Sequence, residues 1–463
     1  MAHESGRRCF RHGSEWILRF RFPVHSTGRL ACLSICLLTV LLPSCPQGKS
    51  PPPAPRNSGW TLTASDDAFL ESLERAAFLF FWEQADPGTG LVADRARADA
   101  SPLDPAQQGV ASIASTGFGL TALCVAAERQ WVPPVEARER VRVTLRFFAQ
   151  TAPQEHGWFY HWMNQSTGQR VWSSEGSSID TALLLAGVLT ARQYFHDDAE
   201  IVQLATTIYD RVDFQWMLNG SPTLLSHGWK PESGFLPNRW DNYSEETVLY
   251  LLAIGSATHP IPPEAWYAWS RHEITYAGYT YISGAPPLFI HQYSHAWVDY
   301  RGRRESSGQH TDYFANSVTA TRAHREFCIS LASEFPKSYS AEVWGITASD
   351  SLQGYVAWGG PPRDSRIDGT VVPSAPAGSL MFTPDICVPA LRALRERFGN
   401  QIYKRYGFVD AFNPTTGWTD SDVIGIDLGI TLLNAENLRS GNVWRWFMRN
   451  PEPVLAMDRV GLR

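Results

Sequence analysis

Three polar stretches place carboxylic acids directly before an apolar helical pattern. They read RVWSSEGSSIDTALLLAG (170–187), RWDNYSEETVLYLLA (239–253) and TGWTDSDVIGIDLGITLLNAENLRSG (416–441). Capping would explain them structurally, because Ser177 with Asp180, and Asn242 with Glu245, have the spacing at which side chains satisfy the amide groups of a first helical turn. The chemical alternative is acid–base catalysis, in which one carboxyl group gives a proton and another takes one.

Glu245 and Asp427 are the strongest candidates for that chemistry. Glu245 follows two aromatic residues, which would raise the pKa of its carboxyl by partial desolvation, as a general acid requires. Asp427 lies in a more polar loop that suits a general base, although Asp420 and Asp422 in that loop would also fit a solvated turn. Glycoside hydrolysis needs two such groups on opposite faces of a sugar ring.

Aromatic residues in polar loops are candidates for stacking on sugar rings. The chain is rich in aromatic residues, with 18 Trp, 16 Tyr and 23 Phe. Three of the tryptophans, Trp82, Trp131 and Trp444, are expected to serve packing alone. The loop candidates are Tyr160, Trp162, Trp172, Trp229, Trp240, Tyr243, Tyr355, Trp358 and Trp418.

His291 and His295 are one helical turn apart in HQYSHAW, so a metal pair has to be considered. No HExxH motif and no third histidine accompany them, so we expect a sugar contact or a hydrogen-bonded structural pair. We therefore expect no metal and no cofactor. Arg239 is the one obvious candidate for a phosphate site.

Seven segments carry a family resemblance that runs in order along residues 65–455. The segments are SIASTGFGLTAL, SSIDTALLLAG, YSEE with LLAIGSATHPI, PLFIHQYSHAW, DYFANS with FC, WGITASDSLQGY and GIDLGITLLNAEN. Together they resemble the glucoamylase-like domain typified by glycoside hydrolase family 144. The resemblance implies an (α/α)6 toroid that hydrolyses β-1,2-glucan with inversion of the anomeric centre and without a metal cofactor.

The resemblance also implies site residues. Glu245 in YSEE and Asp427 in GIDLG match the family's catalytic candidates, with Glu175 and Asp180 of SEGSSID near them. The sequence departs from the family after each of the first two: Glu246 stands where members often have a bulky aromatic residue, and Leu428 where they have a polar one. Glu245 is expected to be the acid and Asp427 the base, with Glu175 in reserve as the acid. Substrate contacts are expected from Asp180, Trp172, Trp229, Arg239, Trp240, Tyr243, His291, His295, Tyr355, Trp358 and Trp418.

Two other functions stay open. A carbohydrate-binding lipoprotein would keep the aromatic residues but would not need Glu245 and Asp427. A phosphorylase or lyase on the same fold is the third alternative, and a phosphorylase would need a basic phosphate site in place of the water pocket. In each case the partner is an oligosaccharide or polysaccharide.

Helical periodicity predicts the elements that must position these residues. After a cap at Ser65, apolar residues recur three and four apart, and Cys124, Cys328 and Cys387 lie in such apolar stretches. Alternation typical of strands is confined to pieces such as YTYISG, so the class is mainly α. No linker divides residues 60–463, which are expected to form one (α/α)6 toroid. Further helices are predicted over 117–129, 135–150, 178–195, 198–214, 245–256, 310–334, 383–398 and 428–438.

The amino-terminal 59 residues are predicted to be an export signal followed by a tether. Arginines precede the apolar run LACLSICLLTVLLPSC, which is typical of an export signal over residues 1–45. LPSC resembles a bacterial lipobox, so we expect lipidation at Cys45 and a periplasmic or outer-membrane-anchored lipoprotein; an ordinary secretory signal cut nearby is the alternative. Residues 46–59 form a Pro-rich tether.

Charge limits the partners further. The formal net charge is −6, and Lys and Arg are scattered along the chain. The sequence therefore shows no basic cluster of the kind that binds nucleic acid. The membrane is expected to be reached only through the lipid anchor. We expect a monomer without a disulfide framework.

Overall fold

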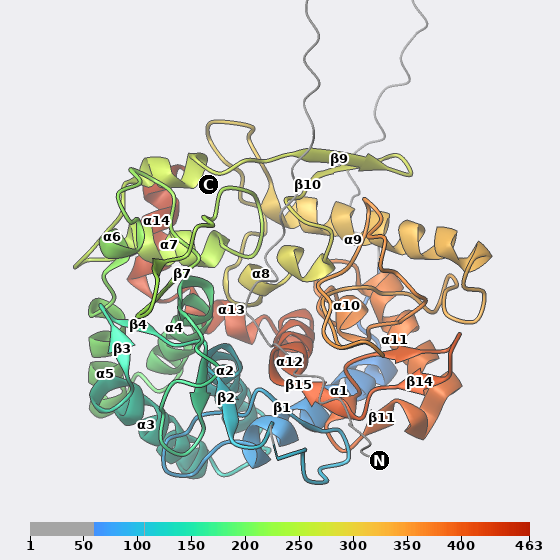
Figure 1. The fold of residues 1–463 in the computed structure, drawn as a ribbon, viewed down its shortest axis with the longest axis horizontal. Helices are drawn as coiled ribbons and strands as arrows, with labels where there is room; N and C mark the ends of the chain where they lie inside the picture. Colours follow the sequence, from blue (N-terminus) through green and yellow to red (C-terminus); the bar gives the residue numbers. More distant parts are fainter. Residues whose placement is uncertain (1–59, 106) are drawn as a thin grey trace, which may run out of the picture. The chain divides into compact units, whose positions relative to one another are not determined.

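Helices form the framework of the molecule, and short antiparallel sheets lie between them (Figure 1). The computed structural model describes residues 60–105 and 107–463. The predicted export signal (1–45), Cys45 and the tether (46–59) therefore lie outside the described residues. The described residues from 60 onward belong to one contact unit.

The α-helices follow one another around the unit. They are α1 (Ala64–Glu83), α2 (Ile113–Glu128), α3 (Pro134–Gln150), α4 (Ser178–Tyr194), α5 (Ala199–Asp210), α6 (Phe214–Met217), α7 (Thr247–Gly255), α8 (Tyr293–Trp297), α9 (Tyr313–Ser330), α10 (Ser374–Ala377), α11 (Pro384–Phe398), α12 (Gly425–Arg439), α13 (Asn442–Phe447) and α14 (Pro451–Val460). The 3-10 helices are η1 (Pro263–Tyr267), η2 (Leu288–His291), η3 (Leu331–Ser333) and η4 (Gly399–Gln401).

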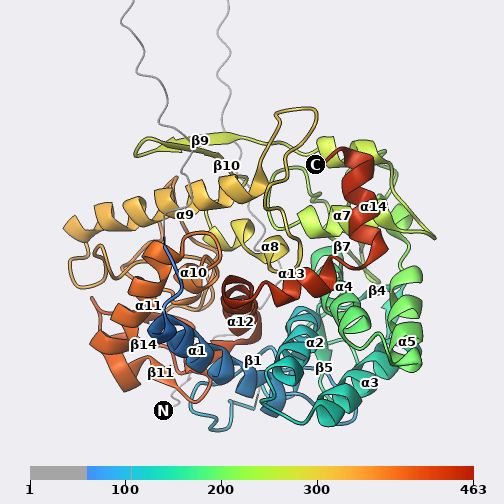
Figure 2. The ribbon, with the colours of Figure 1, turned by 180° about the vertical axis from the view of Figure 1, so that it is seen from behind.

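An inner ring of helices is enclosed by an outer ring (Figures 1 and 2). The inner helices α2, α4, α7, α8, α10 and α12 are buried on almost every side. The outer helices α1, α3, α5, α11 and α14 bury one face and expose the other. Contacts run from α12 to α2, from α2 to α4 and from α4 to α7, while α8 and α10 both pack on α12. This is the predicted (α/α)6 architecture, mainly α.

Glycine allows two inner helices to approach closely. A Cβ atom on Gly187 of α4 would lie 2.1 Å from the carbonyl oxygen of Gly117 in α2, and a Cβ on Gly117 would lie 2.3 Å from the carbonyl oxygen of Leu183. No larger residue fits there without moving a backbone. The two glycines therefore set the distance between α2 and α4.

Short strands fix the loops at one end of the inner ring. Three strands, β2, β6 and β15, run directly into the amino-termini of α2, α4 and α12. Pairing therefore fixes how the chain enters each inner helix. The pairs are β1 (Arg95–Arg97) with β15 (Asp422–Ile424), β2 (Val110–Ser112) with β5 (Trp162–Asn164), β3 (Gln154–Glu155) with β4 (Trp158–Phe159), β9 (Glu273–Tyr276) with β10 (Tyr279–Ile282), β11 (Tyr403–Lys404) with β12 (Gly407–Phe408), and β13 (Phe412–Asn413) with β14 (Trp418–Thr419); β7 (Gly228–Lys230) lies between β6 (Gly176–Ser177) and β8 (Gly234–Phe235).

The predicted helices exist, with shifted ends. The helix expected over 198–214 is two helices, α5 and α6, and the one expected over 310–334 ends as α9 before the 3-10 turn η3. Thr63, not Ser65, caps α1. The expected Asn242 cap of α7 is absent, because that helix begins at Thr247 without a side-chain cap. The helices α8, α10, α13 and α14 were not predicted, since most of them are too short to show a helical period.

Within residues 60–105 and 107–463, the structure confirms the predictions for the three cysteines and for the three packing tryptophans. Cys124, Cys328 and Cys387 are buried free thiols. Trp82 and Trp131 are partly buried against the core, and Trp444 is buried.

In this part of the chain, each helix is too short or too polar to cross a membrane.

Candidate active site

Glu245 lies in the loop that leads into α7, and α8 holds it there. The Ser294 hydroxyl of α8 donates a hydrogen bond to the Glu245 carbonyl oxygen at 2.6 Å and accepts one from the Val248 amide at 2.9 Å. The Ser244 hydroxyl donates to the Glu245 carboxylate. Burial raises the pKa of that carboxyl, and the charge of Asp180 adds to the rise. Glu245 is therefore suited to hold a proton and release it.

Asp427 lies in the first turn of α12, and only 6% of it is exposed. This corrects the expectation of a polar loop, because strand β15 carries the chain into the interior before the helix starts. Burial raises the pKa of Asp427 to about 6, although the neighbouring Asp410 carboxyl and Ser374 hydroxyl favour its ionised form. At neutral pH Asp427 is mostly ionised and can accept a proton.

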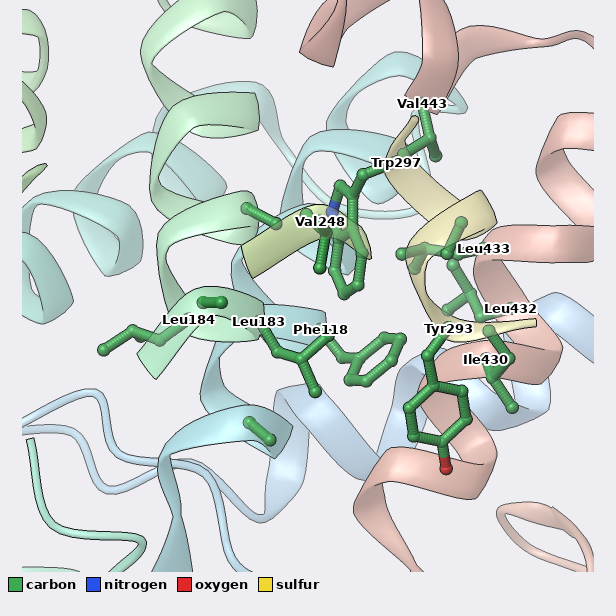
Figure 3. Close-up of a cluster of buried hydrophobic side chains, with 14 of the residues drawn as sticks. Phe118, Leu183, Leu184, Val248, Tyr293, Trp297, Ile430, Leu432, Leu433 and Val443 are labelled. Atoms are coloured by element: carbon green, nitrogen blue, oxygen red, sulfur yellow. The ribbon is translucent and has the colours of Figure 1, made fainter. Parts of the chain in front are cut away.

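Tyr293 of α8 connects these two carboxyl groups. The pKa of its hydroxyl is raised well above the usual value, mainly by burial. The charges of Asp427 and Glu245 are among the further causes. The Tyr293 ring packs edge-on against Phe118, with ring centroids 5.8 Å apart. Figure 3 shows this ring at the border of the apolar cluster, with the hydroxyl pointing away from it. Glu245 and Asp427, 182 residues apart in sequence, thus both lie within electrostatic range of one phenol.

His161 contacts two further carboxylates, those of Glu175 and Asp180. Its Nδ1 atom lies 3.1 Å from Oε1 of Glu175 and 3.4 Å from Oδ2 of Asp180, and its ring stacks on Trp162 with centroids 3.6 Å apart. Burial lowers the pKa of His161, but the charges of Asp180, Glu175 and Asp94 outweigh this and raise it to about 9. His161 is therefore an imidazolium at neutral pH.

The same contact removes Glu175 as a reserve acid. Burial favours its protonated form, but the hydrogen bond and charge of His161 outweigh burial and lower the pKa of Glu175 to about 2. A carboxylate of that kind holds no proton to donate at neutral pH. Asp180 has a double role, since the Ser177 hydroxyl both caps its amide and donates to its carboxylate at 2.6 Å. The predicted Ser177 cap is confirmed.

Asp94 and Arg95 connect this side to Asp427. Trp162 donates through Nε1 to Oδ1 of Asp94 at 3.1 Å, and the Asp94 carbonyl accepts from the Gly425 amide at the start of α12. Arg95 Nη1 lies 2.6 Å from Oδ2 of Asp350. Pairing of β1 with β15 places Arg95 opposite Ile424, the residue directly before α12.

Asp410 and Asp350 complete the group on the α12 side. Oδ2 of Asp410 accepts a hydrogen bond from the Asp350 amide at 2.7 Å. Asp420 and Asp422 are 8% and 4% exposed, so the solvated turn expected there is wrong. Burial, with the charge of Asp350, raises the pKa of Asp420 to about 7. The site is strongly acidic, and Arg95 and His161 supply the positive charge within it.

The predicted sugar-stacking residues fall into three groups. Trp172 and Tyr355 are 44% and 49% exposed, and the Tyr355 hydroxyl lies in the field of Asp427 and Asp410. Four are partly buried: Tyr160, Trp162, Trp229 and Trp418. The other three lie in the interior and correct the expectation: Trp240 stacks on His227 and donates to Ser178, and Tyr243 and Trp358 are at most 2% exposed.

Three further candidates are structural. His291 and His295 are 3% and 2% exposed, and burial lowers the pKa of each to about 3, so they are neutral interior histidines out of reach of a sugar. Arg239 donates to the carbonyl oxygens of Leu218, Leu224 and Asn219, which leaves it tied to the backbone rather than to a phosphate.

Two groups of described residues are compact enough to surround a cation. One is His161 with Glu175 and Asp180, and the other is Asp350 with Asp410 and Asp420; within each, the candidate ligand atoms lie within 4.8 Å of one another. Protein charges already serve both groups. The His161 imidazolium offsets negative charge in the first group, while in the second group Arg95 pairs with Asp350 and the raised pKa of Asp410 favours its protonated form.

Five residues of the site were missed by sequence reasoning. Asp350 and Tyr293 lie in segments that carry the family resemblance, so that signal could have found them. His161 stands between the two predicted stacking residues Tyr160 and Trp162, a signal that could also have found it, whereas no local pattern distinguishes Asp94 and Asp410. The missed residues are Asp94, His161, Tyr293, Asp350 and Asp410.

Comparison with known proteins adds one family match and several relatives. Residues 237–451, which include Glu245 and Asp427, match the family Glycoamylase, described as "Putative glucoamylase". A curated relative, the exo β-1,2-glucooligosaccharide sophorohydrolase (non-reducing end) of Parabacteroides distasonis, is 27% identical over 442 residues, 87% of this chain. This chain spans 59% of the length of that relative.

Solved structures are also similar to this chain. The endo-β-1,2-glucanase of Chitinophaga pinensis, solved with sophorotriose and glucose, is 28% identical with a TM-score of 0.80, covering 87% of this chain and 99% of that one. The β-1,2-glucanase of Parabacteroides distasonis is 26% identical with a TM-score of 0.78, covering 87% of this chain and 60% of that one. The endo-β-1,2-glucanase of Talaromyces funiculosus, 13% identical with a TM-score of 0.61 over 83% of this chain and 87% of that one, shares the fold alone.

Proposed function

We propose that this protein is a glycoside hydrolase that cleaves β-1,2-glucan with inversion, with Glu245 as general acid and Asp427 as general base. One observation carries the proposal: both carboxyl groups lie within electrostatic range of the Tyr293 hydroxyl and differ in their surroundings. The Asp410 carboxyl and the Ser374 hydroxyl line one cavity with Asp427 and favour its ionised form. Burial and the charge of Asp180 favour the protonated form of Glu245, although the hydrogen bond from the Ser244 hydroxyl favours the ionised form.

The reaction follows from these states. Glu245 protonates the glycosidic oxygen as the bond to the anomeric carbon breaks. Asp427 takes a proton from a water molecule that attacks the opposite face of the ring, while positive charge develops on the sugar. The surrounding carboxylates, among them Glu175 and Asp180, favour such a positively charged transition state electrostatically.

Similarity to the β-1,2-glucan hydrolases supports the choice of substrate. The half-exposed rings of Trp172 and Tyr355 supply apolar faces for sugar rings, and ionised carboxylates accept hydrogen bonds from sugar hydroxyls. Relatives that cut internally and relatives that act from the non-reducing end are both similar to this chain. Product sizes therefore have to decide between endo and exo cutting.

The test is incubation of the purified protein with β-1,2-glucan, with and without phosphate, and with β-1,3-glucan as the control substrate. Hydrolysis of β-1,2-glucan alone, without a need for phosphate, is expected, and a time-resolved proton spectrum should show the α-anomer first. Products that require phosphate would indicate a phosphorylase, and unsaturated products a lyase. Binding without cleavage would indicate a carbohydrate-binding lipoprotein.

We also propose that the protein is exported by a bacterium and anchored in a membrane through lipidated Cys45. The support is the sequence alone: an arginine-containing start, an apolar run and the lipobox-like LPSC, followed by a Pro-rich tether. An anchored glycan hydrolase on such a tether would act in the periplasm or at the outer membrane.

A further inference from the structure

Asp410 is a buried carboxyl group with a fixed position beside Asp427. It lies between β12 and β13, and 3% of it is exposed. Its amide donates to the Asp422 carbonyl oxygen at 3.0 Å, and its Oδ2 atom accepts from the Asp350 amide at 2.7 Å. Backbone contacts thus hold both ends of the residue, and its remaining oxygen is free to face Asp427.

A hydrogen bond between the Asp410 and Asp427 carboxyl groups is within reach, and the buried Oδ1 atom of Asp410 has no other hydrogen-bond partner among the described residues. Two ionised carboxylates offer only acceptors, so such a bond requires a proton on one of them. Both residues line a small cavity of about 20 Å³ together with Ser374, and most of its other walls are apolar side chains of α1, α12 and the β12 region. Bulk water therefore does not screen the pair from that side, and a second negative charge is costly there.

The surroundings decide which carboxyl group keeps the proton. The Ser374 hydroxyl lines the same cavity beside Asp427, and its polarity favours the ionised form of Asp427. Asp410 faces the negative charges of Asp427, Asp350 and Asp420, so its own ionised form is disfavoured. The proton therefore resides on Asp410, and the bond runs from Asp410 to Asp427.

We propose that Asp410 is a positioning residue that donates this hydrogen bond to Asp427 and thereby keeps the Asp427 carboxylate ionised and aimed at the attacking water. The inference rests on the proposed hydrolytic function and adds a residue that holds the base without touching the substrate. Asp410 lies in the connection between β12 and β13, and Asp427 lies on α12. The other titratable and charged groups that face this pair lie on other elements. These groups are Asp94, Arg95, Asp350, Tyr355, Asp420 and, through Tyr293, Glu245.

The test compares Asp410→Asn with Asp410→Ala. The Asn amide can accept from the Asp350 amide and donate to Asp427, whereas Ala does neither. Asp410→Ala should lower kcat by about 10- to 100-fold, the effect of losing one hydrogen bond to a charged group, with little change in KM. Its acid limb in the pH–rate profile should move to higher pH, because Asp427 loses a donor that favours its ionised form.

Asp410→Asn should keep kcat within a few-fold of the wild type, and its acid limb should move to lower pH, because the neighbour can no longer ionise. Equal profiles in both variants and the wild type would overturn the inference. So would an Asn variant as impaired as the Ala variant, provided that thermal unfolding shows both to be folded.

A matched control is Glu74→Gln. Glu74 is also a fully buried carboxyl with a pKa raised by burial, but it bonds Arg439 at the far end of α12, 12 residues or about 18 Å from Asp427. Its pH–rate profile should equal that of the wild type. A shift like that of Asp410→Ala would mean that any buried carboxyl has this effect, which overturns the inference.

Infrared difference spectra separate this inference from the proposed function. Between the wild type and Asp410→Asn, without substrate at neutral pH, one protonated carboxyl band should be lost. Absence of that band overturns the inference whatever the protein hydrolyses. A wild type that leaves β-1,2-glucan uncut refutes the proposed function, and the band then still decides whether Asp410 holds the proton.

Discussion

Nδ1 of His161 lies 3.1 Å from Oε1 of Glu175, a pairing of imidazolium and carboxylate that joins the β4-β5 connection to the loop before α4. The backbone repeats the connection, since the His161 amide donates to the Glu175 carbonyl oxygen at 2.9 Å. The pair therefore links the position of Glu175 and Asp180 to the stability of the loops around the site.

Stability should depend on the charge of His161. Its folded pKa of about 9 is above the ordinary value of 6.5, so its contribution is complete below about pH 6.5 and is lost as the pH rises through about 9. His161→Gln should lower the free energy of unfolding by about 2 kcal/mol at neutral pH, the scale of hydrogen bonds to charged groups. Urea unfolding at several pH values measures both effects, and an unchanged pH dependence in the variant would contradict the assignment.

Isosteric amides should separate catalysis from binding. Glu245→Gln and Asp427→Asn should each lower turnover by about three orders of magnitude or more, because an amide keeps the shape but transfers no proton. Glycan binding, followed by calorimetry, should remain measurable. Glu175→Gln should have a smaller effect, because an ionised Glu175 is not the acid. Near-normal turnover in either of the first two variants would remove that residue from its role.

The pH–rate profile of kcat/KM should fall on the acid side with an apparent pKa of about 6, as Asp427 with its partner Asp410 takes up a proton. On the alkaline side it should fall when Glu245 loses its proton, at a pH above the ordinary range of a carboxyl group because its pKa is raised. Initial rates across the pH range measure both limbs. Full activity well below the first limb would exclude Asp427 as the base.

The close contact of α2 and α4 should tolerate no side chain at Gly187. Gly187→Ala should cost about 1–3 kcal/mol or more in stability, because Cβ would overlap the Gly117 carbonyl group. The control is Gly220→Ala, where nothing lies within 4 Å and only the positive φ of 75° opposes a side chain. Thermal unfolding should show the larger loss for Gly187→Ala; equal losses would mean that packing is not the cause.

Anchoring should depend on Cys45. Cys45→Ala should move the protein from the membrane fraction to the soluble periplasmic or extracellular fraction, because the lipid attachment site is lost. Cell fractionation with immunodetection measures this, and Cys36→Ala in the same leader serves as the control. Membrane association that survives Cys45→Ala would argue against lipidation there.

Local patterns in the sequence predicted much of the framework. Helices such as α3, α4 and α11 were found because one turn of apolar spacing is visible within a few residues, and the Ser177 cap because its partner Asp180 is three residues away. The helix entries that carry Glu245 and Asp427 were found in the same way. These features depend on neighbours along the chain, so the sequence by itself determines them.

Only the tertiary structure decided the electrostatic state of the site. Asp410 receives its hydrogen bond from Asp350, 60 residues away, and His161 meets Glu175 across the loop that leads into α4. Burial likewise removed Trp358 and His291 from the expected sugar contacts, although both stand in polar or aromatic segments. A pKa or a buried ring depends on which groups the folded chain brings together and how far they are taken out of water, and neither is encoded in the spacing of residues along one segment.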